Sequence, residues 1–212
     1  MTLLGVSGYT SFMETLYEKI TDALVNDGYI VIDDALEIKL SQKLLQSAQQ
    51  QQNYKEAGIS SSTALHLDKK RRRDKIVWLE RDEASSSQFL DFAEGLQAYL
   101  NRSLYLGLTY YEAHFAHYET GDFYEKHFDA FKNSKNRVVT TVYYLNEEWR
   151  EEDGGELLIY DKKDRLITKL LPKQNRLVVF MSEEFPHEVA PAKKDRYSIA
   201  GWFRVDKKEG VL

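Results

Sequence analysis

A histidine and an aspartate stand two residues apart in the aromatic-rich stretch GDFYEKHFDAFK, which covers residues 121–132. They are His127 and Asp129, and the chain has only five histidines in all. Side chains two residues apart on a β-strand point to the same face. If this stretch is extended, both side chains could therefore bind one metal ion. The pair by itself is weak evidence, because His-x-Asp occurs by chance in many proteins.

A third metal ligand has to come from elsewhere, and His187 in EEFPHEVAP is the only histidine further along the chain. We expect it on a strand that faces the one carrying His127. Two histidines and one carboxylate occupy one triangular face of an octahedral metal ion, which is the arrangement of non-haem Fe(II) oxygenases. Of the three remaining positions, two could chelate a 2-oxoacid and one could take O2.

Arg196 follows His187 by nine residues, in the stretch DRYSIAGWF. A fixed cation in an otherwise apolar strand needs a partner or a ligand carboxylate. Arginine binds carboxylates through two parallel hydrogen bonds, so a dicarboxylate co-substrate could supply that partner. The alternative is a structural salt bridge at the end of the strand. The conjunction of His-x-Asp, a distal histidine and this arginine is more specific than any one of them.

Composition narrows the classes of protein that remain. A chain of 212 residues is long enough for one domain, and 42% hydrophobic with 30% charged residues is typical of a soluble globular protein. A net charge of −5 argues against a general nucleic-acid binder. The chain has no cysteine, so any metal must be held by His, Asp or Glu. We found no long apolar run and no signal-peptide pattern, and expect a cytoplasmic protein without a membrane partner.

The first half of the chain has mostly helical periodicity. Apolar residues at intervals of four predict a helix over residues 11–28, with Phe12, Leu16, Ile20 and Leu24 on its buried face. Further helices are predicted over residues 36–52 and 86–104, and short strands at 29–32 and 76–81. Residues 54–75 are polar, end in the basic cluster KKRRR, and are interpreted as a long loop or flexible hairpin. We interpret the basic cluster itself as a solvated face, with guidance of an acidic partner as the alternative.

After residue 107 the pattern becomes mostly β. Short β-branched and aromatic runs such as RVVTTVYYLN, GELLIYDKK, RLVVFMS and RYSIAGWFRV alternate with turn residues. The chain is therefore predicted to be one α+β domain, residues 1–212, with helical support at about 11–105 packed on one side of a β-sandwich or barrel at about 107–206. Gly154 and Gly155 are expected to form a hairpin turn. Of Tyr143 and Tyr144, one should point inward and the other outward, but the pattern does not say which.

The sequence resembles the Fe(II)- and 2-oxoglutarate-dependent prolyl hydroxylases, especially the hypoxia-sensing prolyl hydroxylase domain proteins and their bacterial relatives. The resemblance runs from Gly28 onward and is most specific in RVVTTVYYLNEEW, GGELLIY and FPHEVAPAKKDRYSIAGWF. DGYIVIDDAL, RRDKIVWLE and HYETGDFYEKHFD also match. The fold it implies is a double-stranded β-helix, that is, a cupin-like jelly roll, supported by N-terminal helices.

The resemblance also implies roles for individual residues. It makes His127, Asp129 and His187 the iron ligands. It places Arg196 and Tyr144 on the distal carboxylate of 2-oxoglutarate, Tyr118 near its metal-chelating end and Leu157 against its methylenes. Arg137 and Trp202 are placed at the substrate. His66, His114 and His117 are not expected to be ligands. His114 and His117 differ by three, so a strand would turn them to opposite faces.

The activity implied is 4-hydroxylation of a prolyl residue in a protein, with conversion of 2-oxoglutarate and O2 to succinate and CO2 and with ascorbate as a reductant. The segment at 54–75 would fold over the peptide, and the bacterial relatives suggest a translation elongation factor as a candidate target. Two alternatives remain open. One is hydroxylation of a free amino acid or small metabolite, and the other is a non-catalytic jelly-roll protein that binds a small acid through Arg196.

Overall fold

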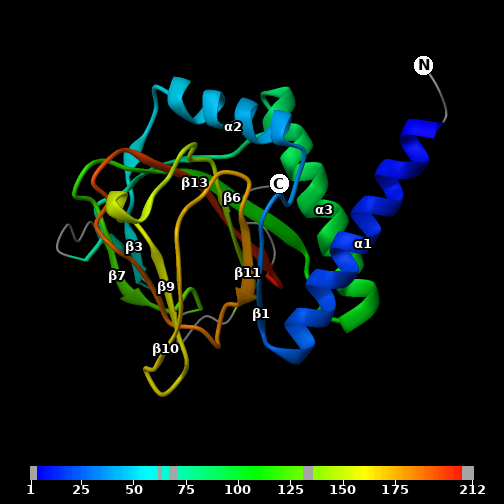
Figure 1. The fold of residues 1–212 in the computed structure, drawn as a ribbon. Coiled ribbons are helices and arrows are strands. Elements are labelled where there is room, and N and C mark those ends of the chain that lie inside the picture. Colours follow the sequence, from blue (N-terminus) through cyan, green and yellow to red (C-terminus); the bar gives the residue numbers. More distant parts are fainter. Residues whose placement is uncertain (1–3, 62–63, 67–70, 131–135, 207–212) are drawn as a thin grey trace.

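The computed structural model of the protein describes residues 4–61, 64–66, 71–130 and 136–206 (Figure 1). Side chains are not described for residues 4–10 and 59–70. The helical elements are α1 (Leu4–Asn26), α2 (Ile38–Gln50), α3 (Ala84–Leu104) and a short 3-10 turn, η1 (Glu151–Asp153). No helix in the described ranges is both long enough and apolar enough to cross a membrane.

The strands of the described residues form a large, a small and a two-stranded sheet. The larger sheet has the order β1 (Tyr29–Ile32), β11 (Leu177–Met181), β8 (Arg137–Tyr144), β13 (Arg196–Arg204), β6 (Tyr110–Tyr118), β5 (Lys75–Trp78), β2 (Lys55–Glu56). The smaller sheet has the order β10 (Leu166–Leu170), β9 (Leu157–Tyr160), β12 (His187–Val189), β7 (Tyr124–His127). β3 (Ile59–Ser61) and β4 (Ala64–His66) pair with each other. All strand pairs are antiparallel.

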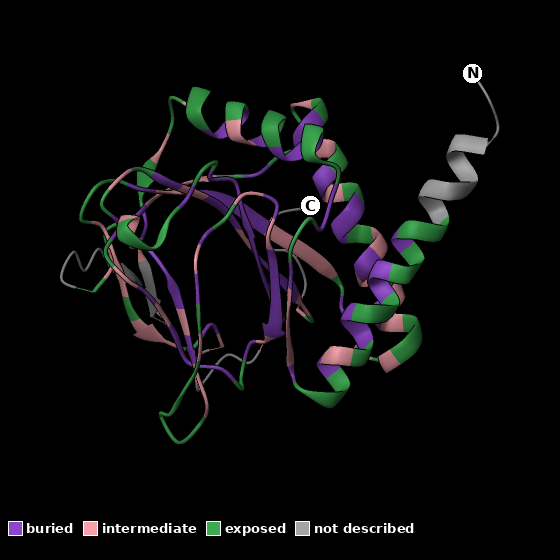
Figure 2. Cartoon of the chain, in the orientation of Figure 1, coloured by how far each residue is buried: buried purple, intermediate pink, exposed green. Residues whose placement is uncertain are grey.

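The helices cover one face of the larger sheet, and the smaller sheet lies on the other side (Figures 1 and 2). Strand alternation divides the side chains of the larger sheet between these two layers. Phe203 and Ile199 of β13 pack in the cluster that contains the helices, whereas Val142 and Tyr144 of β8 pack in the cluster between the sheets. This two-sheet arrangement backed by helices confirms the predicted α+β class.

The predicted helices and strands are found close to their expected positions. The strand at Tyr29–Ile32 is confirmed, and α1 extends further toward the N-terminus than predicted. The predicted buried stripe of this helix was wrong at one position, because Phe12 is 50% exposed and Met13 is buried instead. A stripe that includes Met13, Leu16 and Ile20 has the mixed three- and four-residue spacing of a packed helix.

Gly154 and Gly155 do not make the predicted hairpin turn. They join η1 to β9, and the strands that flank them, β8 and β9, belong to different sheets. Both glycines have φ of +68°. A Cβ on Gly155 would lie 3.1 Å from Cδ of Arg196, so the small residue permits a close approach of the backbone to this arginine.

Candidate metal and co-substrate site

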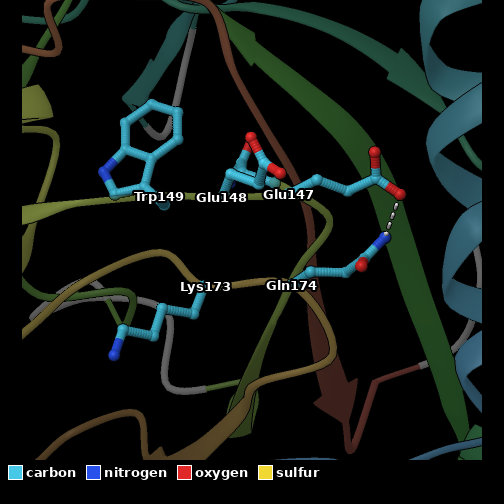
Figure 3. Close-up of a pocket in the computed structure, with 6 residues that line it drawn as sticks. Glu147, Glu148, Trp149, Lys173 and Gln174 are labelled. Atoms are coloured by element: carbon cyan, nitrogen blue, oxygen red, sulfur yellow. Dashed lines mark hydrogen bonds between the residues drawn. The ribbon is translucent and has the colours of Figure 1, made fainter.

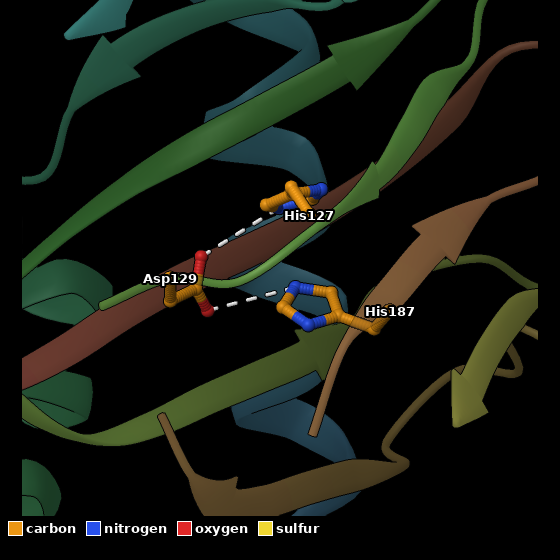
Figure 4. Close-up of side chains that lie close together, drawn as sticks. All are labelled: His127, Asp129 and His187. Carbon is orange, nitrogen blue, oxygen red and sulfur yellow. Dashed lines mark ion pairs between the residues drawn. The ribbon is translucent and has the colours of Figure 1, made fainter. Parts of the chain in front are cut away.

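Three predicted ligand residues come together between the sheets (Figure 4). Nε2 of His127 lies 3.6 Å from Oδ1 of Asp129, and Nε2 of His187 lies 3.6 Å from Oδ2 of the same carboxylate. One ligand atom from each residue lies within 4.8 Å of the other two. Two imidazole nitrogens and one carboxylate oxygen form the donor set that suits Fe(II) in non-haem oxygenases.

The strands position these residues differently from the sequence-based expectation. His127 is the last residue of β7, and its direct cross-strand partner is His187, the first residue of β12. The two histidines therefore lie on adjacent strands of one sheet and not on facing strands. Asp129 lies beyond the end of β7, in a bend, so the prediction that it shares a strand with His127 was wrong.

Backbone carbonyls orient both imidazole rings. Nδ1 of His127 donates to the carbonyl oxygen of Glu125 over 2.7 Å, and Nδ1 of His187 donates to that of Phe185 over 3.1 Å. A carbonyl only accepts, so the proton is on Nδ1 and each Nε2 presents a lone pair. This is the usual way in which a protein fixes the tautomer of a metal-binding histidine.

Electrostatics keep the cluster in the protonation state that binds a metal. Burial lowers the pKa of His187 to about 4, although Asp129 opposes the shift, so this imidazole is neutral at pH 7. Burial would raise the pKa of Asp129, but His187, His127 and Arg137 outweigh it and hold the pKa well below its usual range. A neutral imidazole and an ionised carboxylate are the forms that coordinate metal ions.

Arg196 lines the same pocket and is buried, with 1% of its surface exposed. Its Nε donates to the carbonyl oxygen of Gly155 over 2.9 Å, and Nη1 makes a long contact of 3.4 Å with Oγ of Ser198. Within the part of the chain that the structure describes, no carboxylate pairs with its guanidinium group. An isolated buried charge is strongly unfavourable, so this arginine is suited to an acidic ligand entering the pocket.

The other predicted co-substrate residues surround Arg196. Its guanidinium carbon lies 4.7 Å from the ring centre of Tyr118 and 5.1 Å from that of Tyr144. The buried hydroxyl of Tyr144 makes no hydrogen bond of standard geometry to any described residue. Leu157 is also buried and lines the pocket. The two tyrosines point to opposite faces of β8 as expected, but both are buried: Tyr144 packs beside Arg196 between the sheets, whereas Tyr143 contacts Phe89 of α3.

Arg137 and Trp202, predicted at the substrate, contact each other in the structure. The guanidinium carbon of Arg137 lies 3.7 Å from the ring centre of Trp202, and its Nη2 donates to Glu112 over 3.1 Å. Both residues line the metal pocket and also a neighbouring groove of about 650 Å³. The two hollows therefore share part of their lining and lie next to each other.

The prediction that His114 and His117 point to opposite faces of their strand is confirmed. It was not predicted that His114 would be the one that faces this site. It is buried and lines both hollows, where it contacts Trp78 and Trp202 at ring distances of 5.4 and 5.3 Å. Burial and the nearby Arg72 and Arg137 hold its pKa well below 6.5. His117 points to the opposite face, where it stacks on Tyr197. The alternation of side chains along β6 predicts that the two histidines point to opposite faces, but it does not predict which face lies at the site.

The segment at 54–75 contains strands β2 to β4, and residues 62–63 and 67–70 of the predicted covering loop lie outside the described residues. The basic cluster is not simply a solvated face. Arg72 donates to Asp74 over 2.5 and 2.8 Å, lies 4.5 Å from the ring centre of Tyr124, and lines the metal pocket. The solvated-face interpretation was therefore wrong for Arg72, whereas Arg71 remains about half exposed.

A separate hollow of about 530 Å³ is lined by residues 146–149 and by Lys173 and Gln174 (Figure 3). It contains none of the predicted site residues. Its amides are already engaged: Gln174 donates to Glu147 over 3.4 Å, and Asn146 donates to the carbonyl oxygens of Pro172 and Tyr197. These contacts give no indication of a ligand.

Comparisons with known proteins agree with this geometry. Residues 113–204 match the 2OG-Fe(II) oxygenase superfamily. A prolyl-4-hydroxylase from Pseudomonas putida superposes with a TM-score of 0.82 at 32% identity, over 91% of this chain and 100% of that one. A Trichoplax adhaerens prolyl hydroxylase, solved with a fragment of the hypoxia-inducible factor oxygen degradation domain, gives 0.80 at 26% identity, over 96% and 94%. Egl nine homolog 1 of Rattus norvegicus is 34% identical over 142 residues, which cover 62% of this chain and 41% of that protein.

The chain belongs to the 2OG-Fe(II) oxygenase superfamily, and its fold is that of the jelly-roll prolyl hydroxylases. It spans less than half the length of the rat and human Egl nine homologs that it matches, 41% and 33% respectively. The family implies Fe(II), 2-oxoglutarate and O2, and the residues present fit these groups. The donor set of His127, Asp129 and His187 fits the iron, and the unpaired buried guanidinium of Arg196 fits a carboxylate.

Proposed function

We propose that this chain catalyses 2-oxoglutarate- and O2-dependent 4-hydroxylation of a prolyl residue in a peptide or protein. The reaction converts 2-oxoglutarate to succinate and CO2. One oxygen atom of O2 enters succinate and the other becomes the hydroxyl group of the substrate. The proposal is supported by the prolyl hydroxylases among the relatives, most of all the bacterial one that aligns along its whole length.

The observation that carries the substrate class is the groove of about 650 Å³ beside the metal pocket. Five residues line both hollows: Arg72, His114, Tyr124, Arg137 and Trp202. From this junction the groove extends to the edge strand β2, where Lys55 and Glu56 line it. A free amino acid would occupy only the junction, whereas an extended peptide would occupy the length of the groove.

Each residue of the site has a distinct task in this reaction. Arg196 binds the distal carboxylate of 2-oxoglutarate, Tyr144 donates a hydrogen bond to it, and Leu157 provides an apolar wall that excludes water. Tyr118 lines the chelating end. Bound Fe(II) supplies the activation of O2 and the oxidation itself. The protein therefore contributes orientation, a dry pocket and a fixed protonation state.

Arg137 and Trp202 are assigned to the substrate because they line the junction of the two hollows. We further propose a cytoplasmic location, ascorbate as the reductant, a single domain over residues 1–212, and no nucleic-acid or membrane partner. A translation elongation factor stays a candidate target.

The segment at 54–75 provides the test of substrate class. In the test variant, a short Gly/Ser linker replaces residues 59–66, the β3–β4 hairpin, and the buried Arg72–Asp74 pair is kept. The assay offers wild type and variant a pool of synthetic peptides with one proline each, and free proline in a separate reaction. We expect wild type to add oxygen to peptides, and the variant to lose this activity while its substrate-free conversion of 2-oxoglutarate to succinate stays within a few-fold.

The two rival functions give other results. Oxidation of free proline with unmodified peptides would favour a hydroxylase of small metabolites. Tight binding of 2-oxoglutarate without any succinate would favour a non-catalytic binding protein. Undiminished peptide hydroxylation by the variant would show that the hairpin is not the recognition element.

A further inference from the structure

Of the three predicted metal ligands, His127, Asp129 and His187, only Asp129 does not lie in a paired strand. His127 and His187 are paired with each other across β7 and β12, and both rings are also fixed through Nδ1. Asp129 lies in a bend past the end of β7. Its side chain is nevertheless buried, with 6% of the residue exposed. Some other contact must therefore set the orientation of its carboxylate.

Two buried hydroxyl groups supply that contact. Oγ1 of Thr140, on β8, lies 2.8 Å from Oδ2 of Asp129. Oγ of Ser182, just past the end of β11, lies 2.8 Å from the same Thr140 oxygen. Thr140 is 1% exposed and Ser182 is fully buried. The backbone nitrogen of Ser182 donates to the carbonyl oxygen of Val138 over 3.0 Å, which anchors the outer end of this chain of hydroxyls to the larger sheet.

The direction of the hydrogen bonds follows from the number of protons available. A carboxylate that ligates a metal is ionised and can only accept, so the hydroxyl of Thr140 donates to Asp129. That donation uses the single proton of Thr140. At the second contact its oxygen must accept, and Ser182 is the donor. Each hydroxyl thus polarises the next toward the carboxylate.

We propose that Ser182 and Thr140 are positioning residues for the metal ligand Asp129. The hydroxyl chain holds Oδ2 through Thr140, while Oδ1 faces Nε2 of His127 at 3.6 Å. This inference concerns the metal site of the family and does not depend on which substrate is hydroxylated. The protein anchors its two imidazoles through the backbone and its carboxylate through side chains of the opposite sheet.

The test measures binding of Mn(II), an oxygen-stable substitute for Fe(II), to the metal-free protein by isothermal titration calorimetry. Thr140→Val removes the hydroxyl and keeps the size of the side chain. Loss of such an outer contact typically weakens metal binding by about 10–100-fold, and we expect a loss in this range. Thr140→Ser keeps the hydroxyl and should restore affinity to within about threefold. Ser182→Ala should give an intermediate loss, because Thr140 can still donate.

The neighbouring threonine is the matched control. Thr141 is buried on the same strand but faces the helices, where its hydroxyl contacts that of Tyr111 at 2.7 Å. Thr141→Val also removes one buried hydroxyl, so it should lower the melting temperature and leave Mn(II) affinity unchanged. The proposal is wrong if Thr140→Val binds Mn(II) like wild type, or if Thr141→Val weakens binding equally. Should Thr140→Val fail to fold, wild-type affinity in Ser182→Ala would overturn it.

Failure of this proposal is distinguishable from failure of the proposed function. If Thr140→Val and Ser182→Ala bind Mn(II) with normal affinity, the positioning proposal is wrong, but the proposed peptide hydroxylation is not affected. Absence of Mn(II) binding in the wild type would instead contradict the metal site itself, and both proposals with it.

Discussion

The side chain of Arg196 shows how one residue can carry the argument for a ligand. Its guanidinium group is buried, and the groups that contact it within the described residues are a backbone carbonyl, a hydroxyl and two tyrosine rings. None of these carries a formal negative charge. A dicarboxylate ligand would neutralise the arginine. One of its carboxylates can pair with Arg196, and its other end can face the three predicted metal ligands, which line the same pocket.

Replacement of Arg196 should separate co-substrate binding from metal binding. Arg196→Ala should weaken 2-oxoglutarate binding about 100-fold, because a charge-assisted pair in a buried site is worth on the order of 3 kcal/mol. Tyr144→Phe should have a smaller effect in the same direction. Calorimetry with the Mn(II)-loaded protein measures both. Arg165→Ala, which removes an exposed arginine paired with Asp161, is the control and should leave binding unchanged. Unaltered affinity in Arg196→Ala would place the carboxylate elsewhere.

His187 should make the metal-free protein sensitive to acid. Its pKa of about 4 in the folded state lies below the unfolded value of 6.5, so the unfolded chain takes up the proton first as the pH falls. The stability that neutral His187 contributes is complete above pH 6.5 and is lost as the pH falls toward 4.

Between pH 7.5 and pH 5 this effect amounts to about 2 kcal/mol, since one pKa unit corresponds to about 1.4 kcal/mol. Urea unfolding of wild type and His187→Gln in the presence of a chelator should therefore show a steeper loss of stability in the wild type. Parallel pH profiles for the two proteins would contradict the lowered pKa.

At the scale of elements, the segment between η1 and β9 brings the backbone against Arg196. Gly155 and Gly107 both have positive φ, +68° and +66°, but only Gly155 is crowded. A Cβ on Gly155 would lie 3.0 Å from Ala192 and 3.1 Å from Arg196, whereas a Cβ on Gly107 would meet nothing within 4 Å. Comparing alanine variants at these two positions therefore distinguishes the effect of backbone strain, expected at both, from that of steric contact, expected only at Gly155.

Alanine at each of these positions tests the role of the segment. Both Gly155→Ala and Gly107→Ala should lower the free energy of unfolding by about 1 kcal/mol or more, because the left-handed conformation is strained for alanine. Only Gly155→Ala should also weaken 2-oxoglutarate binding, by displacing Arg196. Chemical denaturation and calorimetry on the same preparations give the two readings. Equal 2-oxoglutarate affinity in both variants would mean that the segment does not position the arginine.

The elements also show why some features could be predicted from the sequence and others could not. Periodicity placed the long helices and most strands, because burial of one face dominates their sequence pattern. It missed that Asp129 lies past the end of its strand, since a ligand held by side chains such as Thr140 leaves no periodic signal. It misassigned Gly154 and Gly155 because a pair of glycines indicates positive φ without indicating whether the chain reverses or changes sheets.

Across the whole molecule, one face of the larger sheet packs against the helices, and the other faces the smaller sheet and the candidate site. Tyr143 packs toward the helices and Tyr144 toward Arg196 between the sheets, although the two are adjacent and chemically identical. The roles of such residues depend on which face the helices cover, and that depends on contacts distant in sequence. Only the resemblance to a known family allowed the inward tyrosine to be chosen beforehand.

The activity of the intact molecule on other proteins is the central claim, and mass spectrometry of a treated cell lysate tests it most directly. Wild-type enzyme with Fe(II), with and without 2-oxoglutarate, should be compared with Asp129→Ala under the same conditions. We expect one or a few prolyl residues to gain a single oxygen atom only with the wild type and 2-oxoglutarate together. An identical set of oxidised prolines in all samples, with 2-oxoglutarate consumed by the wild type, would contradict the assignment as a prolyl hydroxylase of proteins.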